Sequence, residues 1–146
     1  MTTQARTRPG AAPLDLVAVL VGGLIGTTLR VLVDLAMPHG PAQFAVGTLI
    51  VNVVGAFALG LLVAALWPRV PGWVRVGLGP GILGSFTTFS ALAVSIVALA
   101  QNGDAWAAVL SIALSIGLGM LAAGAGLALG ARLGLGRAPG VTEVDE

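Results

Sequence analysis

Four long apolar stretches, separated by short polar turns, make up most of the chain. They cover residues 14–37, 44–67, 73–100 and 105–131. Each holds the roughly 20 apolar residues that a helix needs to cross the hydrocarbon core of a bilayer. The connecting segments are rich in proline, glycine, asparagine and aspartate, which is typical of turns. The pattern predicts an all-α membrane protein with four transmembrane helices.

The third stretch differs from the others because helix-breaking and polar residues interrupt it. Gly79, Pro80 and Gly81 come shortly before Gly84-Ser85-Phe86-Thr87-Thr88-Phe89-Ser90, near the middle of the stretch. A backbone group that lacks a partner in hydrocarbon costs several kcal/mol, roughly 2–7. Irregular backbone at membrane depth is therefore found where it is buried in protein or lines a polar cavity. We expect the third helix to break at residues 84–90 and to turn its carbonyls toward something polar.

Composition narrows the class of protein further. The 146 residues are 57% hydrophobic and 9% charged, which indicates a single membrane domain. The chain has no cysteine and a single histidine, His39, so it offers no thiol chemistry and little for acid–base catalysis. A net charge of +1 is too small to predict nucleic-acid binding. We expect polar tails at residues 1–13 and 132–146 around a membrane domain at residues 14–131.

Arginines are distributed unevenly over the two predicted membrane faces. Six of them lie on one side of a four-span arrangement, and the other side has His39 and Asp104 but no arginine outside a span. By the positive-inside rule, both termini of this plasma-membrane protein are expected to be cytoplasmic. The six arginines are Arg6, Arg8, Arg69, Arg75, Arg132 and Arg137.

Glycines spaced by four residues recur in three of the four spans. Such pairs let two helices approach closely in a membrane. Four spans alone make a thin bundle with little interior, so we expect the protein to form oligomers. The glycine pairs are Gly22 and Gly26, Gly77 and Gly81, and Gly126 and Gly130.

Two polar side chains inside the first two spans are candidates for function. Arg30 lies seven residues before the end of the first span. It either reaches the membrane interface beside Asp34, or it forms a positive wall that attracts an anion. Asn52 lies about eight residues into the second span. Its amide either joins two helices or offers two N–H donors to a dehydrated anion.

Hydroxyl and aromatic groups in the last two spans are equally ambiguous. Ser111 and Ser115 lie four residues apart on one helix face. Serines in such positions most often bond to carbonyls of their own helix, and a hydroxyl ladder beside a pore is the alternative. Phe86 and Phe89 are either packing rings or rings that present their positive edges to an anion.

The order of these motifs resembles that of the Fluc (CrcB) fluoride channels. The resemblance covers all four spans, roughly Leu14 to Ala131. The glycine–arginine element of the first span is weak by itself, whereas the other two elements are specific when they occur together in this order. The three elements are Gly22-Gly23-Leu24-Ile25-Gly26 with Leu29-Arg30, Gly47-Thr48-Leu49-Ile50-Val51-Asn52-Val53-Val54-Gly55, and Gly84-Ser85-Phe86-Thr87-Thr88-Phe89-Ser90.

The resemblance implies an antiparallel dual-topology dimer with two fluoride pores. It also implies a structural sodium ion held by the backbone carbonyls of Gly84 and Thr87, which fits the preference of hard cations for oxygen ligands. A β-branched residue at Gly84 is expected to disrupt that site if the break requires a positive φ there. The implied fluoride path contains Asn52, Phe89, Ser90 and Arg30, with Thr88, Ser111 and Ser115 as further pore-lining candidates.

The chain departs from the family pattern after Ser90. The family motif continues as TTFSTFSxE, whereas this chain reads Thr87-Thr88-Phe89-Ser90-Ala91-Leu92-Ala93-Val94-Ser95. Leu92 therefore replaces the second phenylalanine, Ala91 replaces the adjacent threonine, and Ser95 replaces the glutamate. We expect one of the two polar tracks to be degraded and the main-chain sodium site to be unaffected.

We therefore predict a passive, fluoride-selective channel that lowers toxic fluoride in the cytoplasm and is not an enzyme. Its partners would be fluoride, membrane lipid and a second subunit, which is either the same chain or an oppositely oriented paralogue. The one-sided arginines and Leu92 favour the heterodimer. A non-conducting partner subunit is one alternative. A small proton-coupled drug exporter is another, but it needs an acid deep in a span, and Asp15 and Asp34 lie near the ends of the first.

Overall fold

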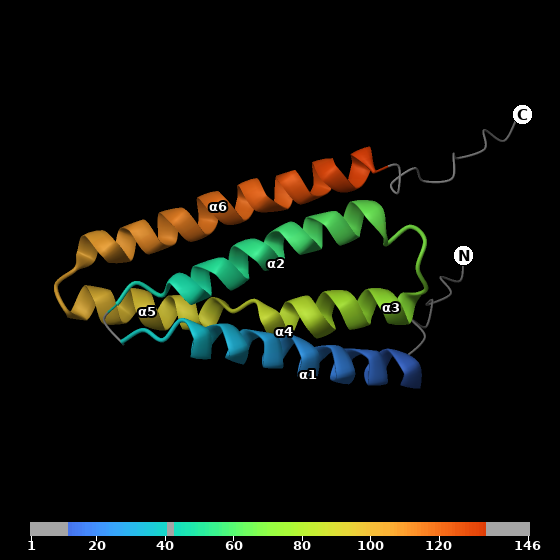
Figure 1. Ribbon diagram of the computed structural model, residues 1–146, viewed down its shortest axis with the longest axis horizontal. Coiled ribbons are helices and arrows are strands. Elements are labelled where there is room, and N and C mark those ends of the chain that lie inside the picture. The colour runs from blue at the N-terminus through green and yellow to red at the C-terminus, as the bar shows by residue number, and fades with distance from the viewer. Residues whose placement is uncertain (1–11, 41–42, 134–146) are drawn as a thin grey trace, which may run out of the picture.

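The computed structural model describes residues 12–40 and 43–133 as a bundle of long helices (Figure 1). Within this range, four helical segments are long and apolar enough to cross a membrane, as predicted. The tails expected at residues 1–13 and 132–146 lie almost wholly outside the described residues. The helices are α1 (Pro13–Ala36), α2 (Val46–Ala65), α3 (Gly72–Val76), η1 (Gly77–Leu83), α4 (Gly84–Phe86), α5 (Phe89–Gln101) and α6 (Ala105–Arg132).

The third span is interrupted, as predicted, but over a shorter segment than expected. Thr87 (φ −77°, ψ 153°) and Thr88 (φ −148°, ψ 122°) are extended, whereas Gly84–Phe86 stays helical. Figure 1 shows this break as the non-helical link between α4 and α5. The prolyl and glycyl residues before it do not break the helix. They form the π-helix η1, which contains Pro80.

Gly84 has ordinary helical geometry, with φ −64° and ψ −29°. The expectation that the break requires a positive φ at this position is therefore wrong. In the described residues, only Gly103, in the turn between α5 and α6, has a positive φ, of 84°. The chain leaves the helix through extended backbone at Thr87 and Thr88, which any residue can adopt.

The predicted glycine pairs lie where helices meet at short distance. A Cβ atom on Gly22 would meet the Gly77 carbonyl oxygen of η1, and one on Gly26 would meet the Ile82 carbonyl oxygen. On the opposite side of the bundle, a Cβ on Gly126 of α6 would meet the Phe57 carbonyl oxygen of α2. Because backbone lies directly against backbone, any side chain at these positions would force the helices apart.

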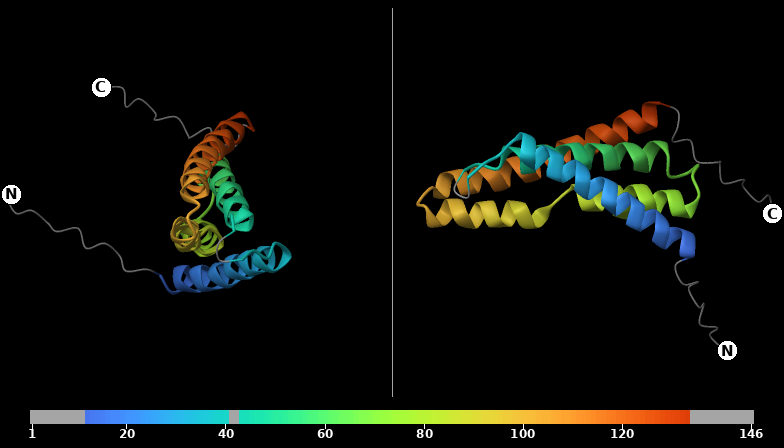
Figure 2. Two further views of the ribbon diagram at one scale, coloured as in Figure 1. Left: turned by 90° about the vertical axis from the view of Figure 1, so that its left-hand side faces the viewer. Right: turned by 60° about the horizontal axis from the view of Figure 1, so that its bottom comes forward.

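The break separates two packing environments along the third span. Its first half, α3 to α4, packs against α1, whereas α5 packs mainly against α6. α2 contacts both halves of the third span and has its largest interface with α6 (Figure 2). The third span therefore changes its main neighbour from α1 to α6 at Thr87 and Thr88.

The described arginines other than Arg30 gather at one end of the bundle. The start of α1, the α2–α3 connection and the end of α6 lie together there (Figure 1). Arg69 is in that connection, Arg75 is in α3, and Arg132 is the last residue of α6. The opposite end holds the α1–α2 connection with His39 and the α5–α6 turn with Asp104.

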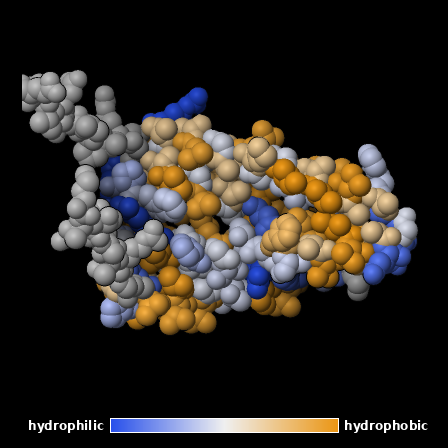
Figure 3. Space-filling model, turned by 180° about the vertical axis from the view of Figure 1, so that it is seen from behind, coloured by the Kyte–Doolittle hydropathy of each residue, from blue (hydrophilic) through white to orange (hydrophobic). Residues whose placement is uncertain are grey.

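Large apolar side chains cover the outside of the bundle, and the buried core is small. Figure 3 shows apolar residues over most of one face, with hydrophilic residues at the ends and near the middle. Leu20, Leu24 and Leu35 on α1 are each more than half exposed. Such a surface suits contact with lipid or with further helices.

Candidate functional site

The site is organised by Asn52 of α2, which bonds to the break in the third span. Its Oδ1 accepts a hydrogen bond from the Thr88 N–H at 2.8 Å, and its Nδ2 donates to the Thr88 carbonyl at 3.0 Å. The two specific motifs of the resemblance, in the second and third spans, therefore meet at Thr88. The side-chain amide satisfies the two backbone groups of Thr88, which extended backbone inside a membrane would otherwise leave without partners.

The break leaves the carbonyls of residues 84–87 without their usual helical donors, and the bonds of Thr88 account for two of them. In an uninterrupted helix, the Thr88 N–H would donate to the Gly84 carbonyl, and the Ala91 N–H would donate to the Thr87 carbonyl. Here the Thr88 N–H donates to Asn52, and the Ala91 N–H donates to the Thr88 Oγ1 at 3.3 Å. The carbonyls of Gly84 and Thr87, the two that the resemblance implies as sodium ligands, are thus among the four that lose their donors.

Gly55 of α2 provides space for the Thr87 side chain. A Cβ atom on Gly55 would overlap the Thr87 Cγ2 methyl group. The Thr87 hydroxyl donates to the Leu83 carbonyl at 2.9 Å, which fixes the rotamer that points this methyl at α2. The asparagine and the following glycine of α2 therefore hold successive residues of the break.

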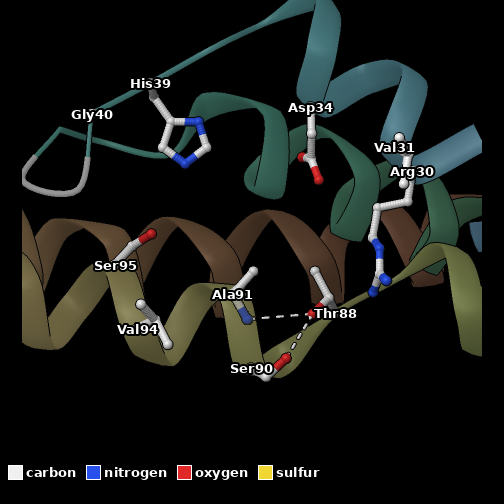
Figure 4. A pocket seen from close by; sticks show the side chains of 10 residues that line it. All are labelled: Arg30, Val31, Asp34, His39, Gly40, Thr88, Ser90, Ala91, Val94 and Ser95. Carbon is white, nitrogen blue, oxygen red and sulfur yellow. Dashed lines mark hydrogen bonds between the residues drawn. The ribbon is translucent and has the colours of Figure 1, made fainter.

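A cavity of about 570 Å³, here named the Arg30 cavity, opens on one side of the break (Figure 4). The Arg30 side chain extends along it toward Thr88, and α5 forms its floor. Arg30 is half-buried, and within the described residues its guanidinium has no hydrogen-bond or ion-pair partner. The lining residues are Arg30, Val31, Asp34, His39, Gly40, Thr88, Ser90, Ala91, Val94 and Ser95.

A second cavity of about 620 Å³, here named the Phe89 cavity, lies toward the arginine-bearing end. Asn52, Gly84 and Thr87 line it together with Phe89, whose side chain is 80% exposed in the single subunit. Most of its surface is apolar, and Leu92 and Ser115 contribute to its wall.

Thr88 lines both cavities, and it is the one described residue that does so. The break and the Asn52 amide therefore separate two open spaces that approach each other from opposite ends of the bundle. The Thr88 hydroxyl lies 3.2 Å from the Ser90 hydroxyl, so polar groups continue from the break into the Arg30 cavity.

The two candidate serines of α6 lie in different surroundings. Ser111 is buried, and its hydroxyl donates to the Ala107 carbonyl of its own helix at 2.8 Å. It lines neither large cavity, only a small one that Ser95, Ser115 and Leu92 also line. Ser115 lines the Phe89 cavity as well, so the structure brings Ser115 but not Ser111 to the main site.

Asp34 and His39 were not predicted as part of the site, although both line the Arg30 cavity. Asp34 lies four residues after Arg30, but the two side chains do not form the ion pair that their spacing suggested. The sequence contained the signal, since a lone histidine shortly after a span that carries three charged residues stands out in so apolar a chain. What it lacked was the fold of the α1–α2 connection over α5 (Figure 4).

Comparisons with known proteins relate this chain to one family. A family model described as CrcB-like protein, Camphor Resistance (CrcB), matches residues 17–127. The Fluoride-specific ion channel FluC 2 of Leifsonia xyli subsp. xyli is 40% identical over 128 residues, covering 84% of this chain and 88% of the relative. The Fluoride-specific ion channel FluC of Rhizobium meliloti is 44% identical over 112 residues, covering 74% of this chain and 89% of that one.

The Fluoride-specific ion channel FluC 1 of Symbiobacterium thermophilum is 44% identical over 120 residues, covering 78% of this chain and 95% of the relative. The match to the family model takes in nearly all of α1 and α6, and both motifs that meet at Thr88. With four membrane-spanning helices and this match, the chain is a multi-pass membrane protein that belongs to the CrcB family.

Proposed function

We propose that the protein is a subunit of a fluoride-selective channel, which lets fluoride leave the cytoplasm passively across the plasma membrane. The observation that carries the proposal is the meeting of the Arg30 and Phe89 cavities at Thr88. This arrangement offers a small ion an approach from each end of the bundle, with only the break to pass. The relatives named as fluoride-specific channels supply the ion. No bond is made or broken, so the function is conduction rather than catalysis.

The polar groups along this route suit an anion that sheds its water. Arg30 supplies a positive charge on one side of the break, with no partner among the described residues. The Asn52 Nδ2 carries two hydrogens, of which one bonds to the Thr88 carbonyl, so the other is available to the Phe89 cavity. Ser90 and Ser115 add hydroxyl donors on the two sides. Cations, and anions that are less basic than fluoride, gain less from such donors than fluoride does.

A sodium ion at the break is the second part of the proposal. The carbonyls of Gly84 and Thr87 have lost the N–H donors that a continuous helix would provide, because those donors bond to Asn52 and Thr88. Carbonyl oxygens are suitable ligands for a hard cation. A cation there would balance the carbonyl dipoles and would also lower the barrier for an anion that passes beside it.

The ion path is incomplete in one subunit, which supports assembly as a dimer. Phe89 is 80% exposed, and Ser90 and Gly84 are exposed as well, although all three lie in the middle of a span. Polar backbone cannot face lipid at that depth. A second subunit that covers the Phe89 cavity in antiparallel orientation would shield the break and complete its walls.

The distribution of arginines favours a partner other than a second copy. Arg69, Arg75 and Arg132 lie at one end of the bundle, so the positive-inside rule predicts insertion with both termini in the cytoplasm. An oppositely oriented paralogue would then supply the second subunit. Leu92 lines the Phe89 cavity in place of the family's second phenylalanine. This replacement supports an assembly in which the partner subunit supplies the intact track.

A proton-coupled exporter finds less support. In the described spans, the acidic residues are Asp15 in the first turn of α1 and Asp34 near its end, and neither lies at mid-membrane depth. Asp15 accepts a hydrogen bond from the Ala12 N–H and so acts as part of a helix cap.

The deciding experiment measures fluoride efflux from liposomes that contain the protein together with any subunit that copurifies with it. We expect efflux of fluoride far above that of protein-free liposomes, and little efflux of chloride from matched vesicles. Equal release of chloride would reject selectivity. Absence of fluoride release, from protein that is shown to be folded and inserted, would reject the channel.

A further inference from the structure

The mouth of the Arg30 cavity contains a histidine that no part of the proposed conduction path uses. His39 lies in the α1–α2 connection, and its Nδ1 is 3.3 Å from the Met37 carbonyl oxygen. Its other ring nitrogen, Nε2, points into the cavity toward α5 (Figure 4). It is the single histidine of the chain.

Few charges surround this imidazole. Arg30 and Asp34 line the same cavity from α1, and the lining residues from α5 are uncharged. α2 contains no ionisable residue. Asp104 lies at the same end of the bundle but outside the lining, where its carboxylate accepts a hydrogen bond from the Ala107 N–H. The charge of the lining is therefore +1 − 1 = 0 with a neutral His39, and +1 when His39 is protonated.

We propose that Arg30 and His39 form a recruitment site for small anions at this mouth, which Asp34 opposes and protonation of His39 strengthens. The inference rests on the proposed function and adds to it one further residue, His39, and a dependence on pH. When Nδ1–H donates to the Met37 carbonyl, the neutral ring presents a lone pair on Nε2 to the cavity, which repels an anion. Protonation replaces the lone pair with an N–H donor and adds a positive charge to the ring.

The site changes the rate of conduction and not its direction, because a passive channel follows the electrochemical gradient. An added charge at the mouth raises the local concentration of anions, as charged clefts do for their ligands. Acid also converts external fluoride into uncharged hydrogen fluoride, which crosses lipid and dissociates in the cytoplasm. Acid therefore acts on fluoride itself as well as on the recruitment site, and a test has to separate the two effects.

Currents through single channels in planar bilayers test this, because uncharged hydrogen fluoride carries no current. Between about pH 8 and about pH 6, we expect the fluoride current of the wild-type channel to rise about twofold, which is the effect of one charge at the mouth in a largely aqueous medium. A higher ionic strength, set with an impermeant salt, should reduce this rise because it screens the charge.

Three variants distinguish His39 from other groups. We expect His39→Gln to show equal currents at both pH values, near the wild-type level at pH 8. His39→Arg should be equally insensitive to pH but near the higher level. Asp34→Asn should raise the current at pH 8, since it removes the opposing charge.

Two results would overturn the recruitment site alone: a conducting wild type whose current does not change with pH, or a pH response that survives in His39→Gln. The second result would point to the α-amino group, which titrates in the same range. If no fluoride current appears at any pH, the proposed function fails and the recruitment site fails with it.

Discussion

The amide of Asn52 pairs with the backbone of Thr88 through two hydrogen bonds, one to the N–H at 2.8 Å and one to the carbonyl at 3.0 Å. A side chain of α2 thereby replaces the backbone partners that the third span loses where it leaves the helix. Asn52 has two roles in this arrangement, since it holds the break open and also lines the Phe89 cavity. The two hydrogen bonds to Thr88 show the first role directly.

Replacing Asn52 with alanine should therefore reduce both stability and conduction. The Thr88 N–H and carbonyl would be left without partners, at a cost of about 1–3 kcal/mol for each buried group. We expect fluoride efflux from liposomes to fall about tenfold or more, together with a lower melting temperature in detergent.

Asn102→Ala is the matched control, because Asn102 also bonds a backbone carbonyl, that of Ala98, but lies in the α5–α6 turn. It should conduct like the wild type. Normal efflux through Asn52→Ala would mean that neither the clamp nor the free N–H contributes to conduction.

Gly55→Ala should disturb the break through a single methyl group. The new Cβ would overlap the Thr87 Cγ2, and overpacking of this kind costs about 1–3 kcal/mol. Thr87→Ser removes that methyl and keeps the hydroxyl that donates to the Leu83 carbonyl. The double variant should recover most of the efflux and stability lost in Gly55→Ala, measured side by side.

Gly117→Ala serves as the control for the glycine series, because a Cβ there meets no atom within 4 Å. It should have no effect on efflux. If Thr87→Ser fails to rescue Gly55→Ala, the contact between α2 and the break does not explain the requirement for glycine.

Sodium dependence should follow the main chain and not the Gly84 side chain. Gly84 is helical, and a Cβ there would lie 3.7 Å from the Gly79 carbonyl oxygen, an ordinary contact. We expect Gly84→Ala to keep sodium-dependent efflux, whereas replacing sodium by a large organic cation should weaken conduction in the wild type. Efflux that is indifferent to sodium in both proteins would remove the sodium site from the proposal.

The arginine distribution predicts one dominant orientation. A reporter fused to the C-terminus of the chain, expressed alone, should be found mostly in the cytoplasm. Fluoride efflux should then rise several-fold when an oppositely oriented paralogue is produced with it. Mixed reporter orientation, combined with strong efflux from the chain alone, would instead support a homodimer.

The spans and their glycine contacts could be predicted because both are local properties of the sequence. Hydropathy alone located the four helices, and spacing by four residues indicated that Gly22 and Gly26 lie at a close helix contact, which the structure shows to be with η1. The break was located to within a few residues, but its cause was not. Glycine and proline before it formed a continuous π-helix, and the helix ended only where Asn52 could bond Thr88.

The remaining features depend on contacts between segments that are distant in the sequence. Asn52 and Thr88 lie 36 residues apart, and a single sequence does not reveal which backbone group an amide will bond. The spacing of Arg30 and Asp34 allowed an ion pair, but in the structure the Arg30 side chain extends toward Thr88 instead. His39 joined the cavity only through the path of the α1–α2 connection.

Because side-chain oxygens of Asn52 and Thr88 capture the donors that would otherwise cover Gly84 and Thr87, the free carbonyls are specified by residues other than their own. During evolution, substitutions at Gly84 or Thr87 could leave those carbonyls in place, while a change at Asn52 on a different helix would remove the side chain that stabilises the break. A search for lost ion sites among relatives of this chain should therefore inspect the asparagine of the second span before the residues whose oxygens face the ion.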